Sequence, residues 1–378
     1  MRLSAAMIVR DEAAHLDACL TTLQGLVDEI VVVDTGSTDD SVAVAHRHDA
    51  VVDHVPWQQD FATPRNRSLD LATGDWILYI DADERVRAGD HAAVRQRLDT
   101  AEDEIAYRVR FVPRSNWTPY REFRLWRHRP EIRFRGAIHE SIVAAIDRVA
   151  RRDGLEIGDL DTLTIDHLGY EGDQTHKHER NEPMLLAGLA TQPDRPFLYD
   201  HLAQIYEARG DLEQARATWR RGIDMARARP TDHPDDRLSF INLLVHAVAH
   251  DDPDGDVPVL LDEAHRRYPG NPAVEFAAAS HEFATDDPAR AVARLEHLIA
   301  LDLEAIVATG SAYDARIFGE WAWNSLGLCR FALGDDPGAV AAFRMAEAAD
   351  PENAAYRTRR RLAEARAAAS GSPPSGGG

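Results

Sequence analysis

The chain contains very little cysteine. Its 378 residues include two cysteines, Cys19 and Cys329, which lie far apart in the sequence. This number excludes a disulfide framework and a zinc site built from cysteines. We therefore expect the protein to work in a reducing compartment, the cytoplasm.

Basic residues are scarce relative to acidic ones. The chain has 43 lysines and arginines against 64 aspartates and glutamates, which gives a formal net charge of −21 at neutral pH. Such an excess of negative charge argues against binding a nucleic-acid backbone or an anionic membrane surface. Apolar runs all fall short of the roughly 18–20 residues needed to cross a bilayer, and the N-terminal segment lacks a signal-peptide cleavage pattern. We expect neither a transmembrane segment nor a nucleic-acid partner.

Strand and helix patterns alternate over the first 100 residues. Short apolar runs rich in β-branched residues are typical of strands buried on both faces of a parallel sheet. After about residue 104 the pattern changes to that of a mixed or antiparallel region. Strands are predicted at 3–9, 29–34, 50–55, 76–80, 105–112, 122–128, 132–134 and 162–167, and the early helices at 12–23, 41–47 and 61–72. The fold class expected here is α/β with a Rossmann-like mixed sheet.

Acidic residues stand where two of the predicted strands end. Asp34 follows one buried strand, and Asp81 and Asp83 follow another. The carboxyl ends of parallel strands meet at one edge of the sheet, so these carboxylates should converge on one crevice. One could contact a ribose or base, and another could bind a hard divalent cation. A solvated acidic turn is the plainer reading of an isolated Asp-x-Asp, but its position after a buried strand favours a functional one.

Several motifs, in this order, resemble those of family 2 glycosyltransferases. The matching segments are AMIVRDE at 6–12, IVVVDTGSTD at 30–39, Trp57 with Asp60 and Phe61, Arg65 with Asn66, and GDWILYIDADE at 74–84. The resemblance covers roughly residues 1–170 and implies a GT-A fold and a nucleotide-sugar donor. The later segments FRGAIHE at 134–140 and HLGY at 167–170 resemble motifs of a subgroup that carries tetratricopeptide repeats and includes transferases acting on bacteriocin peptides.

This resemblance assigns roles to individual positions of the donor site. The segment from Val9 to Glu12 would contact the nucleobase, and Asp34 would bind the base or ribose. Arg65 would hold the diphosphate or ribose. The donor-binding residues implied are Val9, Arg10, Glu12, Asp34, Arg65, Asp81 and Ala82. For Asp34 the alternative is a helix-capping acid, and for Arg65 a surface salt bridge.

A divalent metal, Mn²⁺ or Mg²⁺, is also implied by the resemblance. Asp83 would bind it where it bridges the two phosphates, and Asp81 would contact the ribose or a metal-bound water. His139 could be a further ligand, and His167 is its rival. The cation would neutralise charge that develops on the departing nucleoside diphosphate.

The Glu-Asp pair that supplies the catalytic base in many inverting relatives is not evident in this sequence. Glu140 is the best replacement, since an inverting transferase needs a carboxylate to take the proton of the acceptor. The alternative is that His139 and Glu140 simply pair and pack. The sequence also departs from the family pattern at Pro64, which should start or kink the helix that carries Arg65.

The second half of the chain predicts a helical repeat domain. Four windows fit a helix-turn-helix unit of about 34 residues, the tetratricopeptide period. Small residues in these windows would let paired helices approach, and large ones would fill the groove between pairs. The predicted domains are a GT-A domain at 1–170, a joining helix at 171–194, a repeat domain at 195–368 and a disordered tail at 369–378.

Together these features predict a metal-dependent, inverting glycosyltransferase of the cytoplasm. The donor expected is a uridine-diphosphate sugar. The acceptor could be a peptide or protein side chain, because repeat domains offer extended concave surfaces for chains. The alternatives are a transferase that builds a glycan or lipid-linked saccharide, and an inactive repeat scaffold. Which sugar, which acceptor atom and whether the protein forms a homodimer stay open at this point.

Overall fold

A computed structural model describes residues 1–88, 91–113, 116–169, 175–229, 234–250 and 255–370. The predicted tail and Tyr170 of the last family motif lie outside these residues, except for the end of the last helix. The chain divides into two compact units, Met1–Pro193 with Ile306–Ala312, and Asp194–Ala305 with Tyr313–Gly378. This division differs from the expected boundaries in two places, because residues 175–193 and the short segment Ile306–Ala312 both belong to the first unit.

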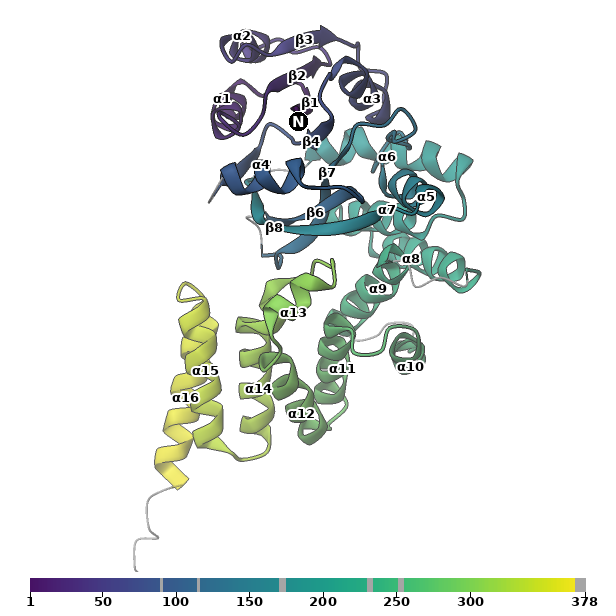
Figure 1. Cartoon of the computed structure of the whole chain (residues 1–378). Coiled ribbons are helices and arrows are strands. Elements are labelled where there is room, and N and C mark those ends of the chain that lie inside the picture. Colours follow the sequence, from purple (N-terminus) through teal and green to yellow (C-terminus); the bar gives the residue numbers. More distant parts are fainter. Residues whose placement is uncertain (89–90, 114–115, 170–174, 230–233, 251–254, 371–378) are drawn as a thin grey trace, which may run out of the picture. The chain divides into compact units, whose positions relative to one another are not determined.

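The first unit is built on a mixed sheet of eight strands in the order β3-β2-β1-β4-β7-β6-β8-β5 (Figure 1). The strands β3, β2, β1 and β4 run parallel, and β7 then pairs antiparallel with β4. Beyond β7, the strand β6 is antiparallel to β7 and parallel to β8, and β5 closes the sheet antiparallel to β8. The bounds are β1 Leu3–Val9, β2 Glu29–Asp34, β3 Val51–His54, β4 Trp76–Tyr79, β5 Glu84–Ala88, β6 Glu104–Pro113, β7 Tyr120–Arg127 and β8 Glu156–His167.

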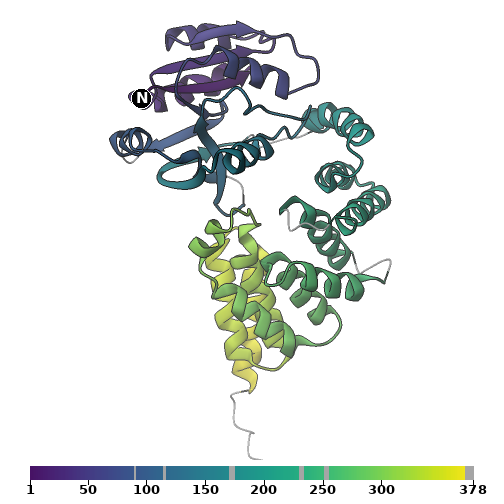
Figure 2. The same ribbon diagram turned by 45° about the vertical axis from the view of Figure 1, so that its right-hand side comes forward.

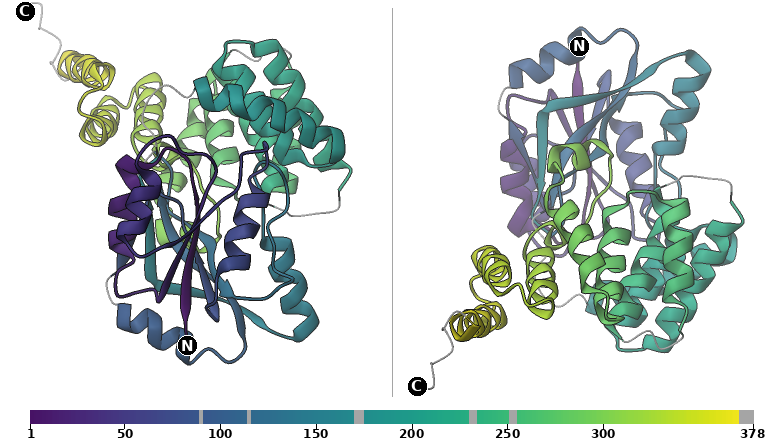
Figure 3. Two further views of the ribbon diagram at one scale, coloured as in Figure 1. Left: turned by 90° about the horizontal axis from the view of Figure 1, so that it is seen from above. Right: turned by 90° about the horizontal axis from the view of Figure 1, so that it is seen from below.

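Helices cover both faces of this sheet, which explains the nearly continuous apolar character of its central strands. On one face, α1, α2 and α4 share a core with the side chains of Leu3, Met7 and Val32. On the other, α3 and α5 pack against Ala6, Val31 and Ile77 (Figure 3, left). The helices of the first unit are α1 Ala13–Thr22, α2 Ser41–Arg47, α3 Ala62–Leu71, α4 His91–Asp99, α5 Val143–Asp153 and α6 Thr175–Thr191. The predicted α/β mixed-sheet class is confirmed.

Local chemistry explains where α3 begins. Asp60 accepts hydrogen bonds from the backbone N–H of Ala62 at 2.8 Å and from the hydroxyl of Thr63 at 2.7 Å. Pro64 therefore lies in the first turn, where its missing N–H costs no helical hydrogen bond. This placement is one of the two outcomes expected for Pro64, and it lets Arg65 follow on a regular helix.

The second unit is helical throughout its described residues, and its helices stack as antiparallel pairs (Figure 2). Glycines lie at tight crossings: a Cβ on Gly222 would come within 2.2 Å of the Ser239 hydroxyl, and one on Gly327 within 2.5 Å of the Phe343 ring. At these two positions small residues therefore let neighbouring helices approach closely, as the sequence predicts. The bounds are α7 Pro196–Ala208, α8 Leu212–Arg227, η1 Pro234–Arg237, α9 Leu238–Ala249, α10 Val257–Arg267, α11 Pro272–Ala284, α12 Pro288–Ile299, η2 Ala315–Phe318, α14 Glu320–Ala332, α15 Asp336–Ala349 and α16 Ala354–Ser370. The short helix α13 Leu303–Ala308 spans the boundary, because its residues from Ile306 onward belong to the first unit.

Among the described residues, none of the helices is long and apolar enough to cross a membrane. This agrees with the absence of a long apolar run in the sequence.

Candidate functional site

The site lies at the edge where the parallel strands end. The strand β1 ends at Val9, and its neighbours β2 and β4 end at Asp34 and Tyr79. The chain moves outward from β1 to β2 and β3 and then returns to the other side of β1 for β4. A crevice forms at such a reversal of strand order, outside the carboxyl ends.

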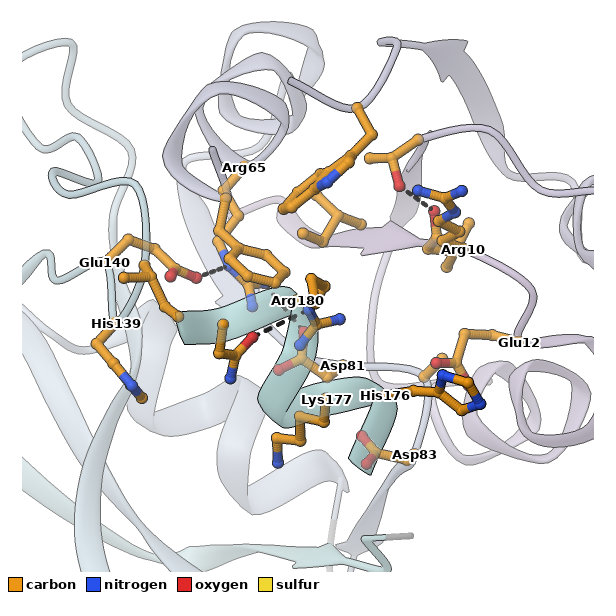
Figure 4. A pocket seen from close by; sticks show the side chains of 18 of the residues that line it. Arg10, Glu12, Arg65, Asp81, Asp83, His139, Glu140, His176, Lys177 and Arg180 are labelled. Carbon is orange, nitrogen blue, oxygen red and sulfur yellow. Dashed lines mark hydrogen bonds and ion pairs between the residues drawn. The ribbon is translucent and has the colours of Figure 1, made fainter. Parts of the chain in front are cut away.

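A cavity of about 940 Å³ occupies this edge (Figure 4). Its walls come from the loops after β1, β2, β3 and β4, from α3, from the 138–140 segment, from the end of β8 and from α6. The lining residues are Ile8, Val9, Arg10, Glu12, Thr35, Trp57, Phe61, Arg65, Asp81, Ala82, Asp83, Ile138, His139, Glu140, His167, His176, Lys177, Arg180 and Asn181. All of the predicted site residues except Asp34 are among them.

The loop after β1 is held by the loop after β2. Asp11, at a positive φ of 55°, accepts a hydrogen bond from the backbone N–H of Thr38 at 2.7 Å. The backbone N–H of Glu12 donates to the Ser41 hydroxyl at 2.7 Å, and that of Ala13 donates to Asp39 at 2.9 Å. The Gly-Ser-Thr-Asp segment therefore fixes the cavity wall that Val9, Arg10 and Glu12 provide.

Asp34 takes part in the same loop but not in the lining. Its carboxylate accepts hydrogen bonds from the backbone N–H groups of Gly36 and Ser37, both at 3.1 Å, and lies 3.3 Å from the His54 imidazole. Burial raises the pKa of Asp34, but these hydrogen bonds outweigh burial and leave the pKa below its ordinary value. In this structure Asp34 organises the turn, and its neighbour Thr35 reaches the cavity.

Arg65 lies between two carboxylates at the floor of the cavity. Its Nη1 is 3.0 Å from Asp81 Oδ1, and its Nε donates to Glu140 Oε1. The guanidinium also stacks over the Tyr79 ring at 4.4 Å, and the Tyr79 hydroxyl donates to the second oxygen of Asp81 at 2.9 Å. The Arg65 side chain thus links its own motif to the one at 134–140, in which Glu140 lies 75 residues further along the chain.

The two carboxylates respond differently to this environment. Burial raises the pKa of Asp81, but the positive charges of Arg65 and Arg124 outweigh it, so the pKa lies below the ordinary range. Burial also raises the pKa of Glu140, and there Arg65 only partly opposes it, so the pKa lies above the ordinary range. Asp81 is the firmly ionised member, and Glu140 is the one with the greater tendency to accept a proton.

Behind Asp81 lies a second buried ion pair. Arg124 donates to both carboxylate oxygens of Glu84, at 2.7 and 3.2 Å, and Glu84 accepts the backbone N–H of Asp81 at 2.8 Å. Burial raises the pKa of Glu84 and Arg124 opposes this. The groups that contact the Glu84 carboxylate, which are the Arg124 guanidinium and the Asp81 backbone N–H, all donate hydrogen bonds to it. Such donors stabilise the charged form of a carboxylate. The pair fixes the backbone from which Asp81, Ala82 and Asp83 face the cavity.

The two candidate histidine ligands differ in position. The Nε2 atom of His167 lies 3.1 Å from Asp83 Oδ2, and the hydrogen bond between them raises the pKa of His167. His139 lies beside Glu140 in Figure 4, at a positive φ of 49°. Within the described ranges, no group of three or more histidine, cysteine, aspartate or glutamate side chains forms a ready metal cage. The carboxylate of Asp83 and the imidazole of His167 do offer two adjacent metal donors, an oxygen and a nitrogen.

Sequence reasoning missed the contribution of α6. His176 and Lys177 fall in the segment that the sequence predicts only as a joining helix, yet they line the cavity together with Arg180 and Asn181. The Arg180 guanidinium lies 5.2 Å from the centre of the Phe61 ring. A usable signal did exist, since Lys177 is the only lysine in the entire chain.

Comparison with known proteins finds a family model that matches the first part of the chain. Residues 4–157 match the model described as Glycosyl transferase family 2. A TPR repeat-containing protein of Synechococcus elongatus is 32% identical over 266 residues, which cover 69% of this chain and 64% of that protein. The SPbeta prophage-derived glycosyltransferase SunS of Bacillus subtilis is 24% identical over 202 residues, 51% of this chain and 46% of SunS. The chain thus spans less than two thirds of the length of these relatives.

Solved structures give weaker likenesses. The structure of S. aureus TarS 1-349 in complex with UDP-GlcNAc aligns with 71% of this chain and 92% of that chain, at a TM-score of 0.40 and 16% identity. Glucosyl-3-phosphoglycerate synthase from Mycobacterium tuberculosis, in complex with Mn²⁺, UDP and glucosyl-3-phosphoglycerate, aligns with 50% of this chain and 79% of that chain, at a TM-score of 0.35 and 18% identity.

Proposed function

We propose that the protein transfers a sugar from a nucleoside diphosphate to an acceptor, with inversion at the anomeric carbon, and that residues 4–157, which match the family 2 glycosyltransferase model, form its catalytic domain. The donor proposed is a uridine-diphosphate sugar. One observation carries the proposal: the cavity at the carboxyl edge of the sheet gathers Asp81, Asp83, Arg65 and Glu140 on its walls. Its volume of about 940 Å³ is large enough for a nucleotide sugar.

The donor would lie along the edge of the strands. The segment from Val9 to Glu12 would contact the base, and Asp34 would act by shaping the turn beside it. Asp81 would contact the ribose or a metal-bound water. Because Arg65 and Tyr79 already hold both oxygens of Asp81, this carboxylate has a fixed direction before any ligand arrives.

A divalent metal, Mn²⁺ or Mg²⁺, belongs to the proposal. Asp83 and His167 would hold it, since a carboxylate oxygen and an imidazole nitrogen lie 3.1 Å apart there. When bound, the cation supplies charge neutralisation at the diphosphate leaving group. His167 must be neutral to bind a metal, so its elevated pKa makes metal binding weaker in acid.

Glu140 is the proposed general base. Its pKa lies above that of an ordinary glutamate, which suits proton removal near neutral pH. Arg65 keeps the carboxylate ionised and fixes one of its oxygens. The other oxygen would accept the proton of the acceptor as its oxygen, sulfur or nitrogen attacks the sugar.

The acceptor proposed is a peptide or protein side chain. This rests on the helical repeats, whose stacked pairs form extended surfaces suited to chains. A saccharide or lipid-linked acceptor is the competing outcome, and both require the same donor chemistry.

The direct test is a panel of nucleotide sugars. The full chain is incubated with UDP-, GDP- and dTDP-sugars in Mn²⁺, and released nucleoside diphosphate is measured, first without acceptor and then with peptide or saccharide acceptors. We expect slow hydrolysis of one UDP-sugar and none after the metal is removed with EDTA. Release from no donor, in protein that is folded by circular dichroism, would contradict the proposal and favour an inactive scaffold.

A further inference from the structure

The single lysine of the chain lines the cavity. The sequence has 43 basic residues, and all of them except Lys177 are arginines. Lys177 projects from α6, a helix that lies beyond the matched family domain at residues 4–157. Figure 4 shows its ammonium group among the cavity-lining side chains, with Arg180 one turn further along the same helix.

Neither cation on α6 has a carboxylate partner in the described part of the chain. The hydrogen bond found for Arg180 goes to the side-chain oxygen of Asn181, at 3.0 Å. Its guanidinium otherwise lies over the Phe61 ring, 5.2 Å from the ring centre. By contrast, Arg65 and Arg124 in the same unit are each neutralised by two carboxylates.

A third cation adds positive charge to the cavity. Arg10, on the loop after β1, also lines the cavity, and its contact with Asp11 is loose at 3.9 Å. Burial lowers the pKa of Arg180, and the positive charge of Arg10 lowers it further. Like charges that repel one another inside a cavity favour an anion between them.

We propose that Lys177 and Arg180, together with Arg10, form a subsite for a phosphate-type oxyanion in this cavity. The proposal rests on the proposed function, which supplies one such anion, the diphosphate of the donor. An anionic group on the acceptor is the other source of the same chemistry. An ammonium binds phosphate as a compact point charge, whereas a guanidinium binds it through paired donors, so the two side chains are complementary.

The lone lysine makes a direct experiment possible. In full-length protein an acetylating N-hydroxysuccinimide ester can modify amines only at Lys177 and at the N-terminus, where Met1 pairs with Asp99 at 3.3 Å. Peptide mass spectrometry then follows both sites in one sample. The Met1 amine serves as the internal reference for reagent and folding.

Four conditions separate the sources of the anion: Mn²⁺ alone, and Mn²⁺ with uridine, with UDP or with inorganic phosphate. We expect UDP to slow acetylation of Lys177 at least about fivefold, uridine to change it less than about 1.5-fold, and Met1 to be unaffected. Protection by phosphate but not by UDP would assign the subsite to an anionic acceptor. It would also remove the support for a UDP donor while the oxyanion subsite stands. Equal acetylation of Lys177 in all conditions would overturn the subsite.

Variants provide the second readout by calorimetry of UDP and uridine binding. Lys177→Met should weaken UDP about tenfold and leave uridine unchanged, and Lys177→Arg should recover most of the loss. The control is Arg152→Met on the exposed side of α5, where the side chain pairs with Asp153. Wild-type protein that binds UDP, with an unchanged affinity in Lys177→Met, would overturn a donor role for Lys177. Loss of uridine binding as well would mean that the substitution disturbs the whole cavity and would count against the subsite.

Discussion

Each of the two units buries an aspartate, and the partners of the two side chains differ. Asp81 in the sheet unit accepts from the Arg65 guanidinium and the Tyr79 hydroxyl at the wall of a cavity. Asp200 in the repeat unit is 1% exposed and accepts from three neutral donors, those of Trp219, Asn242 and Gln204. The pKa of Asp81 is lowered, whereas burial raises the pKa of Asp200 to about 6.

This difference shows that burial alone does not mark a functional carboxylate. Asp200 on α7 joins α8 through Trp219 and α9 through Asn242, so it ties three helices together. The contacts of Asp81 instead keep its carboxylate charged at the wall of the cavity. A pKa shift points to a site only when a cavity and a charged partner accompany it.

The largest expected effect tests the cavity side of this comparison. Asp83→Ala should reduce sugar transfer by about a thousandfold, because it removes the proposed metal ligand. The melting temperature should change little, since the ion pair of the Asp83 side chain is with His167 at the cavity wall and lies outside the hydrophobic core. Turnover is measured at saturating Mn²⁺, with Asp161→Ala on β8 as the control for removing an acid. Near-normal turnover would refute the metal role of Asp83.

Glu140→Gln should lower the turnover number about a hundredfold and leave UDP affinity unchanged. The amide keeps the shape of the side chain but cannot take the proton. The comparison variant is Glu131→Gln, which removes an exposed contact to Arg152. Full activity in Glu140→Gln would mean that the base is another group or that the acceptor arrives already ionised.

The buried Asp200 of the repeat unit predicts how the free energy of unfolding changes with pH. The native pKa of Asp200 is about 6, against an ordinary value of 3.8. The native state therefore binds the proton more tightly, and the free energy of unfolding falls as pH rises from about 4 to 6, by up to about 3 kcal/mol from this group. Asp200→Asn should remove that contribution, measured as the wild-type-minus-variant difference in urea unfolding from pH 4 to 7. A difference that stays constant over this range would contradict the assignment.

The smallest effect concerns the ion pair behind Asp81. Glu84→Gln should weaken the Mn²⁺-dependent part of UDP binding about tenfold, because the backbone N–H of Asp81 loses a charged acceptor. The fold should survive, since Arg124 keeps Glu122 as a partner at 3.1 Å. The matched control is Asp159→Asn, which disturbs the paired Arg108 contact on β6 and β8 at 2.8 Å. Equal losses in the two variants would show that Glu84 acts through general stability alone.

Much of the sheet could be predicted because its signal is local. The strands at Leu3–Val9 and Glu29–Asp34 match the prediction residue for residue. By contrast, residues 132–134 form no strand, and the nearby pairing is an isolated bridge between Arg135 and Ser141. Short apolar segments there pack into a core without joining a ladder, which periodicity alone cannot distinguish.

The sequence predicts which residues belong to the site, but it does not predict which of them contact one another. Asp81 and Asp83 follow a buried strand, and this position indicates a crevice without any knowledge of the loops and helices around it. That Arg65 touches Glu140, 75 residues away, depends on how α3 and the 134–141 turn pack. The approach of Lys177 to the cavity depends in the same way on α6, which no strand pattern locates.

The seven residues Ile306–Ala312 have a consequence for synthesis of the protein on the ribosome. They belong to the same compact unit as residues 1–193, although more than a hundred residues separate the two segments. At ribosomal speeds of 5–20 residues per second, roughly ten seconds pass between the emergence of the two. During that interval the nascent sheet unit lacks part of its surface contacts, while several helix pairs leave the exit tunnel. The order of translation thus makes completion of the first unit wait for most of the second, and a stop codon placed after residue 193 would leave the first unit permanently unfinished.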